Sequence, residues 1–449
     1  MASSKKKKKK TEKRNFRFWI KGPLNYNLLF AIMFLNIFGL IMMYSASYYS
    51  AANLKLPTYH FLKSQFTYVL LGFFCMWVVS KINYHFWIKM GWVGFILSGV
   101  LIGLLLTPLG FGALGATRWL DFGFVKFQAA EPVKLLMMVF FAMFVAKNDL
   151  DAIRYECPRI RKIIAEKIPS DRFPFNRFPL KKIFKFKGVP HRWMAWACAL
   201  IISGMIAVIS NNVSTAIIVL GVCCVIIVAS QKKIGFYMKA FVGLAIFVIL
   251  FLLAIEFVIP SSSEENFRIT RIRAFMHPEE YMSSTSVQPM QALYAIGAGG
   301  FWGQGLGQSL VKFKLAEPYN DYILAIICEE LGVFGACMLL FLFGYLLVQI
   351  VKIERNACDI AGKVFCVGVF AQVAIQTVLN VMVVIGWFPT TGVSLPFISY
   401  GGASAIFLLI EFGVVFNIDS YAKDRKYRSE AVKEVDEQEK KRLQQLLLK

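Results

Sequence analysis

LLFAIMFLNIFGLIMMYSASY, residues 28–48, is an apolar segment without a single charged side chain. As a helix, a segment of this length matches the roughly 30 Å hydrocarbon thickness of a bilayer. The lysine-rich residues before it resemble the start of a signal peptide, but no cleavage-site pattern follows the apolar segment. The segment therefore predicts an uncleaved first membrane-spanning helix.

Apolar segments of similar length recur along the chain, which is 57% hydrophobic with a mean hydropathy of +0.57. A soluble protein would not expose so many of them, and a lipid-embedded chain satisfies its backbone hydrogen bonds as helices. The sequence predicts an all-α polytopic membrane protein, with one bundle over residues 28–418 and no separate soluble domain. The ten expected helices lie at about 28–48, 66–82, 87–106, 131–145, 194–209, 215–229, 236–259, 322–351, 364–387 and 405–416.

The formal charge of +23 is unevenly distributed along the chain. Basic residues gather in an N-terminal tail (1–27), in one long loop (147–192) and in a charged C-terminal tail (419–449). Basic segments beside membrane helices favour the cytoplasmic side, which accounts for the charge without nucleic-acid binding. We therefore expect both termini in the cytoplasm and a large extracytoplasmic loop, residues 260–321, between the seventh and eighth helices.

Several cations fall on the outer side, where the charge bias predicts few of them. They are Arg118, Lys126, Arg268, Arg271, Arg273, Lys312 and Lys314. Some would pair with nearby glutamates, but the excess indicates an anionic ligand. Arginines and the backbone N–H groups of glycine-rich turns are common ligands of pyrophosphate, and a run of glycines occupies 297–307.

Charged residues also occur inside the expected helices, at a cost of roughly 2.5 to 3.5 kcal/mol each, so they usually face a partner or an interior cavity. Glu131 and Lys134 are three residues apart, which places them on one helix face and allows them to pair. A structural ion pair and a substrate contact are both open for this pair. For Glu411, in the tenth helix, a structural role is favoured.

The sequence contains no recognisable nucleotide or metal motif. The nine cysteines lie in apolar segments or cytoplasmic loops, and none belongs to a CxxC metal site. GQGLGQS lies in a loop between membrane helices and does not follow a strand, so it does not indicate a dinucleotide site. The metal requirement is unknown from the sequence.

Three ordered segments resemble the SEDS family (shape, elongation, division and sporulation), the FtsW, RodA and SpoVE proteins of bacteria. They are GATRWLDFGFVKFQAAEPVK (115–134), QALYAIGAGGFWGQGLGQSLVKFKLAEPYNDYILAIICEELG (291–332) and TGVSLPFISYGGAS (391–404). The resemblance covers nearly the whole chain from the first helix to Asp419. It implies a protein of the bacterial cytoplasmic membrane.

The resemblance implies a peptidoglycan glycosyltransferase that polymerises lipid II at the outer membrane face during cell division or elongation. Lipid II is a disaccharide peptide carried on undecaprenyl pyrophosphate. The implied partners are a class B penicillin-binding transpeptidase and other divisome or elongasome membrane proteins. No cofactor is certain, although a divalent cation, Mg²⁺ or Mn²⁺, would suit a pyrophosphate substrate.

The resemblance and the charge pattern together give a set of candidate substrate-binding residues. They are Arg118, Trp119, Glu131, Lys134, Arg268, Arg271, Arg273, Gln288, Gln291, Lys312, Glu317, Asp321, Glu329 and Ser399. Asp321 matches a family aspartate at the start of the eighth helix. Because a carboxylate at a helix N-terminus often caps it, we expect capping rather than catalysis from Asp321.

The catalytic base implied by the resemblance is an aspartate in an Asp-Pro pair, and this chain departs from the family at that place. Tyr281 and Met282 occupy the two positions when the segments are aligned without a gap. The nearest carboxylates are Glu280 and Glu279, and we expect Glu280 to serve as the base. A second departure is Asn212, where the family has an aspartate.

Two other functions are open on the sequence alone. A transporter or flippase of lipid-linked sugars would use the same intramembrane charges as a path. A non-catalytic scaffold of the division or elongation machinery would tolerate the missing aspartate.

Overall fold

The computed structural model describes residues 19, 22–113, 116–123, 126–148, 191–230, 267–277, 279–281, 286–315 and 317–447. The expected seventh helix (236–259) and nearly all of the basic loop (147–192) lie outside these ranges. The described chain is mostly helical, as predicted. Its helices are α1 (Tyr26–Asn53), α2 (His60–Lys81), α3 (Tyr84–Lys89), α4 (Gly91–Gly103), α5 (Ala130–Asn148), α8 (His191–Ile209), α9 (Val213–Ala229), α11 (Phe267–Met276), α12 (Val287–Gly299), α13 (Ile323–Asn356), α14 (Ile360–Val384) and α15 (Gly402–Leu447).

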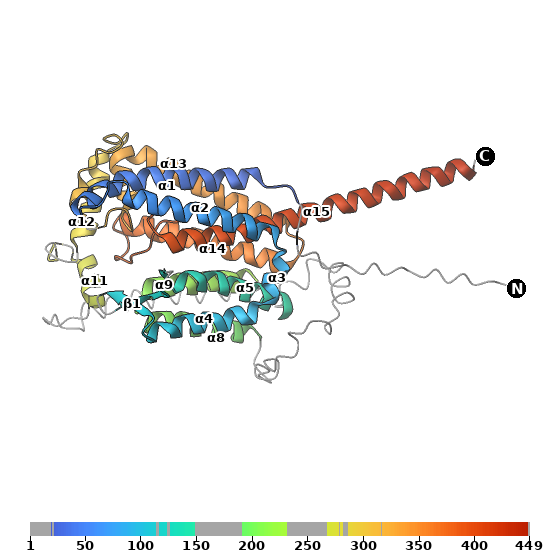
Figure 1. Ribbon diagram of the computed structural model, residues 1–449, viewed down its shortest axis with the longest axis horizontal. Coiled ribbons are helices and arrows are strands. Elements are labelled where there is room, and N and C mark those ends of the chain that lie inside the picture. Colours follow the sequence, from blue (N-terminus) through green and yellow to red (C-terminus); the bar gives the residue numbers. More distant parts are fainter. Residues whose placement is uncertain are drawn as a thin grey trace.

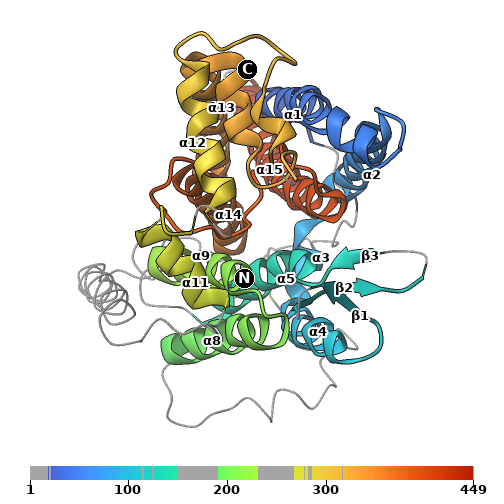
Figure 2. The same cartoon turned by 90° about the vertical axis from the view of Figure 1, so that its left-hand side faces the viewer.

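The long helices run side by side in two groups (Figure 1). In the first group α15 packs along α2, α1 packs on α13, and α12 lies against α13. In the second, α4 packs on α5 and α8 on α9, as the end-on view in Figure 2 shows. Helix α14 contacts α13 on one side and α5 and α9 on the other, so it joins the two groups.

Five described helices are long and apolar enough to cross a membrane. They are α1, α2, α13, α14 and the part of α15 from Gly402 to Asp424. Three shorter apolar helices cover Gly91–Leu106, Trp193–Ile209 and Val213–Ala229. Since the described ranges omit the expected seventh helix, the total of ten remains a prediction.

Helix α1 shows how the apolar segments divide their side chains between core and lipid. Ile32 and Leu35 are completely buried, whereas Phe30, Phe34 and Ile37 are about half exposed. In water such a row of exposed large side chains would be unfavourable, but against acyl chains it costs nothing. The buried Asn36 donates its side-chain amide to the carbonyl of Ile32 at 2.7 Å, which satisfies that donor within the helix.

The expected third helix (87–106) is broken in the structure. Helix α3 ends at Lys89, α4 begins at Gly91, and a short 3₁₀ helix covers Leu104–Leu106. Asn83 caps α3 by accepting a hydrogen bond from the N–H of His85 at 3.1 Å. Asn417 of α15 also holds the start of α3, because its side chain accepts a hydrogen bond from the N–H of Tyr84 at 2.8 Å. Hydropathy detects the apolar length of this segment. It does not detect the Asn83 cap, which makes the helical segment begin at Tyr84 rather than at 87.

A small antiparallel sheet, which the sequence did not predict, follows α4. Its strands are β1 (Gly110–Ala113), β2 (Ala116–Asp121) and β3 (Lys126–Gln128), in the order β1-β2-β3. Leu120 on the central strand is fully buried and packs in a small apolar cluster with Leu105 and Ala129. The sheet therefore anchors the segment between α4 and α5 to the bundle.

Segment 260–321, expected as an extracytoplasmic loop, contains two helices, α11 and α12, within its described residues. Both lie at the end of the bundle opposite the projecting part of α15 (Figure 1). Helix α15 corrects a further expectation, since it continues without interruption through the predicted boundary at Asp419 to Leu447. Near Asp419, Ser420 donates a 3.4 Å hydrogen bond to the carbonyl of Pro23, so the start of α1 and the middle of α15 meet at the same end.

The glycine-rich segment 299–307 packs against a break in α13. Gly332 has φ 70° and ψ −175°, outside helical geometry. The N–H groups of Gln304 and Gly305 donate to the carbonyls of Glu329 and Glu330, both at 2.9 Å. A Cβ on Gly303 would lie 2.3 Å from the carbonyl oxygen of Glu330, so only glycine permits this approach. These two N–H groups hold the broken helix, so they are not available to a pyrophosphate, and binding by the rest of the run stays a prediction.

Candidate active site

The residue at the centre of the candidate site is Asp321, directly before the start of α13. The N-cap of α13 is Tyr322, and no side chain makes a capping hydrogen bond there. The expected capping role of Asp321 is therefore wrong. The Asn380 side-chain amide instead donates to the backbone carbonyl of Asp321 and to that of Val393, each at 2.8 Å. Asn380 thus ties the start of α13 to the turn that follows α14.

Gly392 brings that turn close to the carboxylate of Asp321. Its φ is +67°, a left-handed conformation that glycine adopts without strain. A Cβ at this position would lie 3.3 Å from Oδ2 of Asp321. The absence of a side chain leaves the space beside the carboxylate open.

Two arginines and one glutamate interact electrostatically with Asp321. Arg271 of α11 and Arg118 of β2 lower the pKa of Asp321, and Glu317 raises it. Burial is the largest effect, and the net result raises the pKa of Asp321 to about 6. The guanidinium of Arg271 is itself positioned by a 3.2 Å hydrogen bond to the carbonyl of Thr390. Burial and Arg118 together lower the pKa of Arg271 from its ordinary value.

In the described structure, the residues next to Asp321 in the chain and the residue before Gly392 carry buried polar atoms without a protein hydrogen-bond partner. They are Oδ1 of Asn320, Oη of Tyr322 and Oγ1 of Thr391. Tyr322 is only 5% exposed. Because nearly all buried polar groups in folded proteins are paired, such orphaned atoms mark a place where water or a polar ligand binds.

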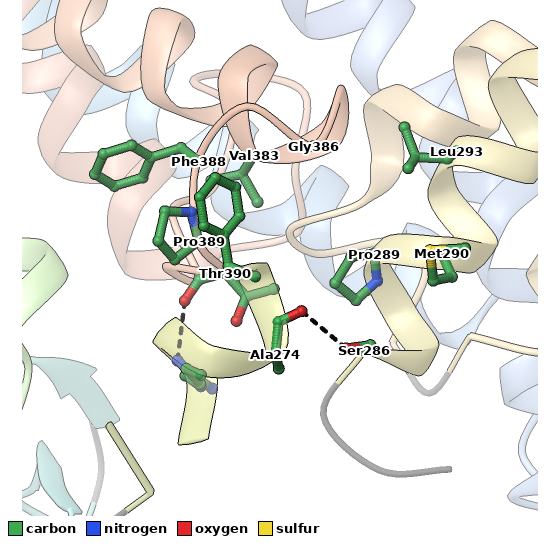
Figure 3. Close-up of a pocket in the computed structure, with 12 residues that line it drawn as sticks. Ala274, Ser286, Pro289, Met290, Leu293, Val383, Gly386, Phe388, Pro389 and Thr390 are labelled. Carbon is green, nitrogen blue, oxygen red and sulfur yellow. Dashed lines mark hydrogen bonds between the residues drawn. The ribbon is translucent and has the colours of Figure 1, made fainter. Parts of the chain in front are cut away.

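An apolar pocket of about 80 Å³ lies beside Arg271 (Figure 3). Phe388 and Pro389 from the turn after α14 face Pro289, Met290 and Leu293 of α12 across it. The hydroxyl of Ser286 donates to the carbonyl of Ala274 at 3.1 Å and joins the end of α11 to the start of α12. A cationic group thus borders an apolar cavity, an arrangement suited to an amphiphilic anion.

The structure brings four of the sequence-predicted residues together: Arg118, Arg271, Glu317 and Asp321. They come from β2, α11 and the segment before α13, so the site is assembled from three separate parts of the chain. Glu317 also accepts a hydrogen bond from the side-chain amide of Asn320, which orients its carboxylate.

Glu131 and Lys134 form the predicted ion pair, with Nζ and Oε2 2.8 Å apart. Both side chains are buried in α5. Glu411 of α15 is fully buried and interacts electrostatically with both residues of this pair. It also accepts a 2.9 Å hydrogen bond from the Gln372 amide. This polar group lies within the helix bundle, and its contacts favour the structural role.

Lys312 and Glu329 belong to a third group, which holds α1, α13 and the glycine-rich segment together. Nζ of Lys312 lies 3.5 Å from Oε1 of Glu330, and both side chains are completely buried. Glu330 also accepts a hydrogen bond from the Ser45 hydroxyl at 2.6 Å. The carboxylate of Glu329 accepts bonds from the Ser309 hydroxyl and from the N–H of Leu310. These contacts leave Lys312 and Glu329 as framework groups rather than open ligand-binding groups.

The remaining predicted residues occupy varied positions. Ser399 accepts a hydrogen bond from the N–H of Leu395 at 2.8 Å and closes a turn. Glu279 and Glu280 are exposed in the turn between α11 and α12. Gln288 and Gln291 are partly buried on α12, Trp119 is 40% exposed on β2, Arg273 is buried on α11, and Arg268 lies in α11 with its side chain outside the described part.

Asn212, the second departure from the family pattern, has a clear local role. Its side chain caps α9 by accepting a hydrogen bond from the N–H of Thr215 at 3.1 Å. Asparagine and aspartate are both good N-caps, so the substitution preserves the helix start.

Sequence reasoning missed Asn380, Thr390 and Gly392 as parts of the site. Asn380 is a buried amide inside an apolar helix, which is a usable signal because such a group requires partners. Thr390 contributes through its backbone carbonyl, which no side-chain pattern reveals. Gly392 was inside a family-like segment, but its proximity to Asp321 depends on the fold.

Comparison with known proteins places the chain in a family. The FtsW/RodA/SpoVE cell cycle protein model matches residues 26–424. Stage V sporulation protein E of Bacillus subtilis is 30% identical over 400 residues, covering 88% of this chain and 97% of that protein. A probable peptidoglycan glycosyltransferase FtsW of Trichlorobacter lovleyi is 29% identical over 398 residues, covering 88% of this chain and 93% of that protein.

Solved structures agree on the fold. One chain of a peptidoglycan synthase complex that coordinates polymerization and crosslinking superimposes with a TM-score of 0.65 at 18% identity, over 89% of this chain and 98% of that one. The rod shape determining protein RodA of Thermus thermophilus gives a TM-score of 0.57 at 19% identity, over 88% and 96% of the two chains. The chain therefore belongs to the FtsW/RodA/SpoVE family of membrane-embedded cell cycle proteins.

Proposed function

We propose that this protein is a peptidoglycan glycosyltransferase that polymerises lipid II at the outer face of the bacterial cytoplasmic membrane. The observation that carries the proposal is the partly buried carboxylate of Asp321 with Arg118 and Arg271 beside it, at the end of the bundle that holds α11 and α12. Support comes from relatives named as probable peptidoglycan glycosyltransferases over nearly their whole length.

The proposed reaction transfers a glycan from a lipid pyrophosphate to a sugar hydroxyl. The hydroxyl oxygen of the incoming lipid II bonds to the anomeric carbon of the lipid-linked glycan end. The bond from that carbon to the phosphate oxygen breaks, and the pyrophosphate leaves with the electron pair. A carboxylate accepts the hydroxyl proton, and Arg118 and Arg271 stabilise the charge that develops on the leaving group.

The pocket in Figure 3 provides a place for the polyprenyl end of the substrate. Its lining is largely apolar, with Phe388, Pro389 and Leu293 among the lining residues, and it includes Arg271. A pyrophosphate held by Arg271 would place the first isoprene units against this apolar lining. The remainder of the chain would extend along lipid-facing helix surfaces.

Metal binding and partners extend the proposal. In the described ranges no group of three or more His, Cys, Asp or Glu is arranged to hold a metal ion. A divalent cation would therefore be held mainly by the pyrophosphate oxygens, beside Glu317 and Asp321. The proposed partners are a class B penicillin-binding transpeptidase and other divisome or elongasome membrane proteins, with both termini of this chain in the cytoplasm.

The test is polymerisation of lipid II by the purified full-length protein, alone and with its cognate transpeptidase. Glycan chains resolved by gel electrophoresis, and absent when the transpeptidase is assayed alone, would establish the activity. Transport of lipid II across proteoliposomes without polymer would favour a flippase. Partner binding with neither activity would favour a scaffold.

A further inference from the structure

We infer that Asp321 is the general base of this enzyme, in place of the aspartate that the family pattern leads one to expect near Tyr281. The inference rests on the proposed glycosyltransferase function and names the group that removes the proton from the acceptor hydroxyl. Glu280, the base expected from the sequence, is the competing assignment.

The carboxylate of Asp321 is not used to hold the start of α13. The carboxylate does not cap α13, whose N-cap makes no side-chain hydrogen bond. The backbone carbonyl of Asp321 is held by Asn380, so the residue is fixed in place without use of its carboxylate. The neighbouring Gly392 leaves the approach open, because its missing Cβ would otherwise lie 3.3 Å from Oδ2. The carboxylate is thus positioned and available to a ligand.

Residues adjoining Asp321 and Gly392 carry buried polar atoms that could bind a ligand. Tyr322 is 5% exposed, and its hydroxyl has no hydrogen-bond partner in the described structure. Oδ1 of Asn320 and Oγ1 of Thr391 are in the same condition. Three unpaired polar atoms on residues adjoining Asp321 and Gly392 are consistent with a sugar, which would present several hydroxyl groups to them. Among the described residues of the turn that carries Glu280, namely 277, 279–281 and 286, no buried polar atom lacks a partner.

The charged groups beside Asp321 are suited to a leaving pyrophosphate. In a displacement at the anomeric carbon, the base and the groups that stabilise the departing pyrophosphate must lie on opposite sides of one sugar, within several ångströms. Arg118, Arg271 and Glu317 are the charged groups that face Asp321, and the two arginines come from different elements. Both arginines interact electrostatically with Asp321, so a base at Asp321 and cations that stabilise the leaving group can act on one bound substrate.

The electrostatics agree with this geometry. Burial and Glu317 raise the pKa of Asp321 to about 6, although Arg271 and Arg118 oppose the rise. A base with a pKa just below the working pH is mostly deprotonated and still accepts a proton readily. Proton transfer from the acceptor hydroxyl to Asp321 would leave a neutral carboxyl, which returns the proton to water after the product moves on.

The experiment compares Asp321→Asn, Glu280→Gln and Asp121→Asn in the full-length protein bound to its transpeptidase, with lipid II as substrate. Asp121 is a suitable control because it is an outer-face aspartate that pairs with Lys126 at 2.7 Å and lies outside the proposed machinery. We expect Asp321→Asn to lower kcat by about 10²- to 10⁴-fold with KM changed less than about threefold, the usual effect of losing a general base. Asp121→Asn and Glu280→Gln should remain within about threefold of wild type.

A pH profile provides the second readout. The wild-type kcat/KM should fall about tenfold per unit below a pH of about 6, and the residual activity of Asp321→Asn should lack this dependence. Asp321→Glu should recover part of the rate with a displaced profile. An active wild type with an unaffected Asp321→Asn would overturn the assignment and leave the proposed function standing, as would loss of activity in Glu280→Gln alone. No polymer from the wild type would overturn both.

Discussion

At the scale of single residues, Asp121 and Asp321 show how surroundings separate two identical side chains. Hydrogen bonds from Lys126 and from the N–H of Gly123 lower the pKa of Asp121. Burial and Glu317 raise the pKa of Asp321 to about 6. The first aspartate ends the central strand of the small sheet and pairs with Lys126. The second is partly buried among orphaned polar atoms, as is typical of groups retained for function.

The raised pKa of Asp321 has a consequence for stability. The folded protein binds this proton more tightly than the unfolded chain, so stability falls as the pH rises from about 4 to about 6 and the penalty is complete above that. We expect Asp321→Asn to increase the free energy of unfolding by about 1 to 3 kcal/mol at pH 7.5. The gain should shrink as the pH approaches 4.

Thermal unfolding followed by tryptophan fluorescence, at several pH values, would measure this change. A variant less stable than wild type at every pH would show that the carboxylate supports the fold. Stabilisation together with loss of polymerisation is the signature of a residue kept for activity at the expense of stability.

Residue types and their predicted side of the membrane were enough to identify Arg118, Arg271, Glu317 and Asp321 as candidates. The same two properties also made Lys312 a candidate ligand-binding residue, but they did not reveal that Lys312 is buried in a structural ion pair. Hydropathy gives the depth of a residue but not its neighbours in the bundle. The contact of Lys312 with Glu330 depends on the glycine-rich segment folding onto α13.

That contact gives a second prediction, at the scale of secondary-structure elements. Because the side chains of Lys312 and Glu330 are fully buried, Lys312→Met would leave a buried carboxylate without its cation. We expect a loss of about 3 kcal/mol in stability, the usual cost of breaking a buried pair. The double variant Lys312→Met/Glu330→Gln should recover most of it. Normal unfolding with weakened lipid II binding would instead assign Lys312 to the substrate.

The break in α13 at Gly332 should be disturbed by the addition of a single methyl group at that position. Gly332 has φ 70°, and a Cβ there would lie 2.3 Å from the carbonyl oxygen of Phe301. We expect Gly332→Ala to lower the free energy of unfolding by more than about 2 kcal/mol, since left-handed strain alone costs roughly 1 to 2 kcal/mol. Gly344→Ala, in an open position of the same helix, should be neutral or slightly stabilising. Equal unfolding temperatures for the two variants would contradict a required break.

Element boundaries were predictable where apolar length decides them and unpredictable where polar contacts do. The first helix was expected over 28–48 and is observed as Tyr26–Asn53. The broken third helix depends on hydrogen bonds of Asn83 and Asn417. The small sheet depends on strand pairing, which its short segments do not reveal in their sequence pattern. Helix α15 exceeds its apolar length because charged residues are compatible with a solvated helix.

At the scale of the whole molecule, the positions of cations predict that its two ends differ in function. Arg118 lies on β2 near Asp321, whereas Lys187 belongs to the basic loop outside the described ranges. We expect Arg118→Ala to lower the rate of lipid II polymerisation about 10²-fold by weakening charge stabilisation, and Lys187→Ala to have little effect. Polymerisation rates of the two purified variants provide the measurement. Similar rates would argue against an active site on the outer side.

Helix α15 connects these two ends through one uninterrupted element. The backbone N–H of Tyr400, two residues before this helix, donates to the carbonyl of Tyr319 at 2.9 Å, and Tyr319 is two residues from Asp321. From Gly402 to Leu447 the helix has 46 residues, about 70 Å at 1.5 Å per residue. Because α15 is uninterrupted over its described length, an axial displacement of its projecting part would be transmitted along the helix to the segment beside Tyr319 and Asp321, at the opposite end of the bundle.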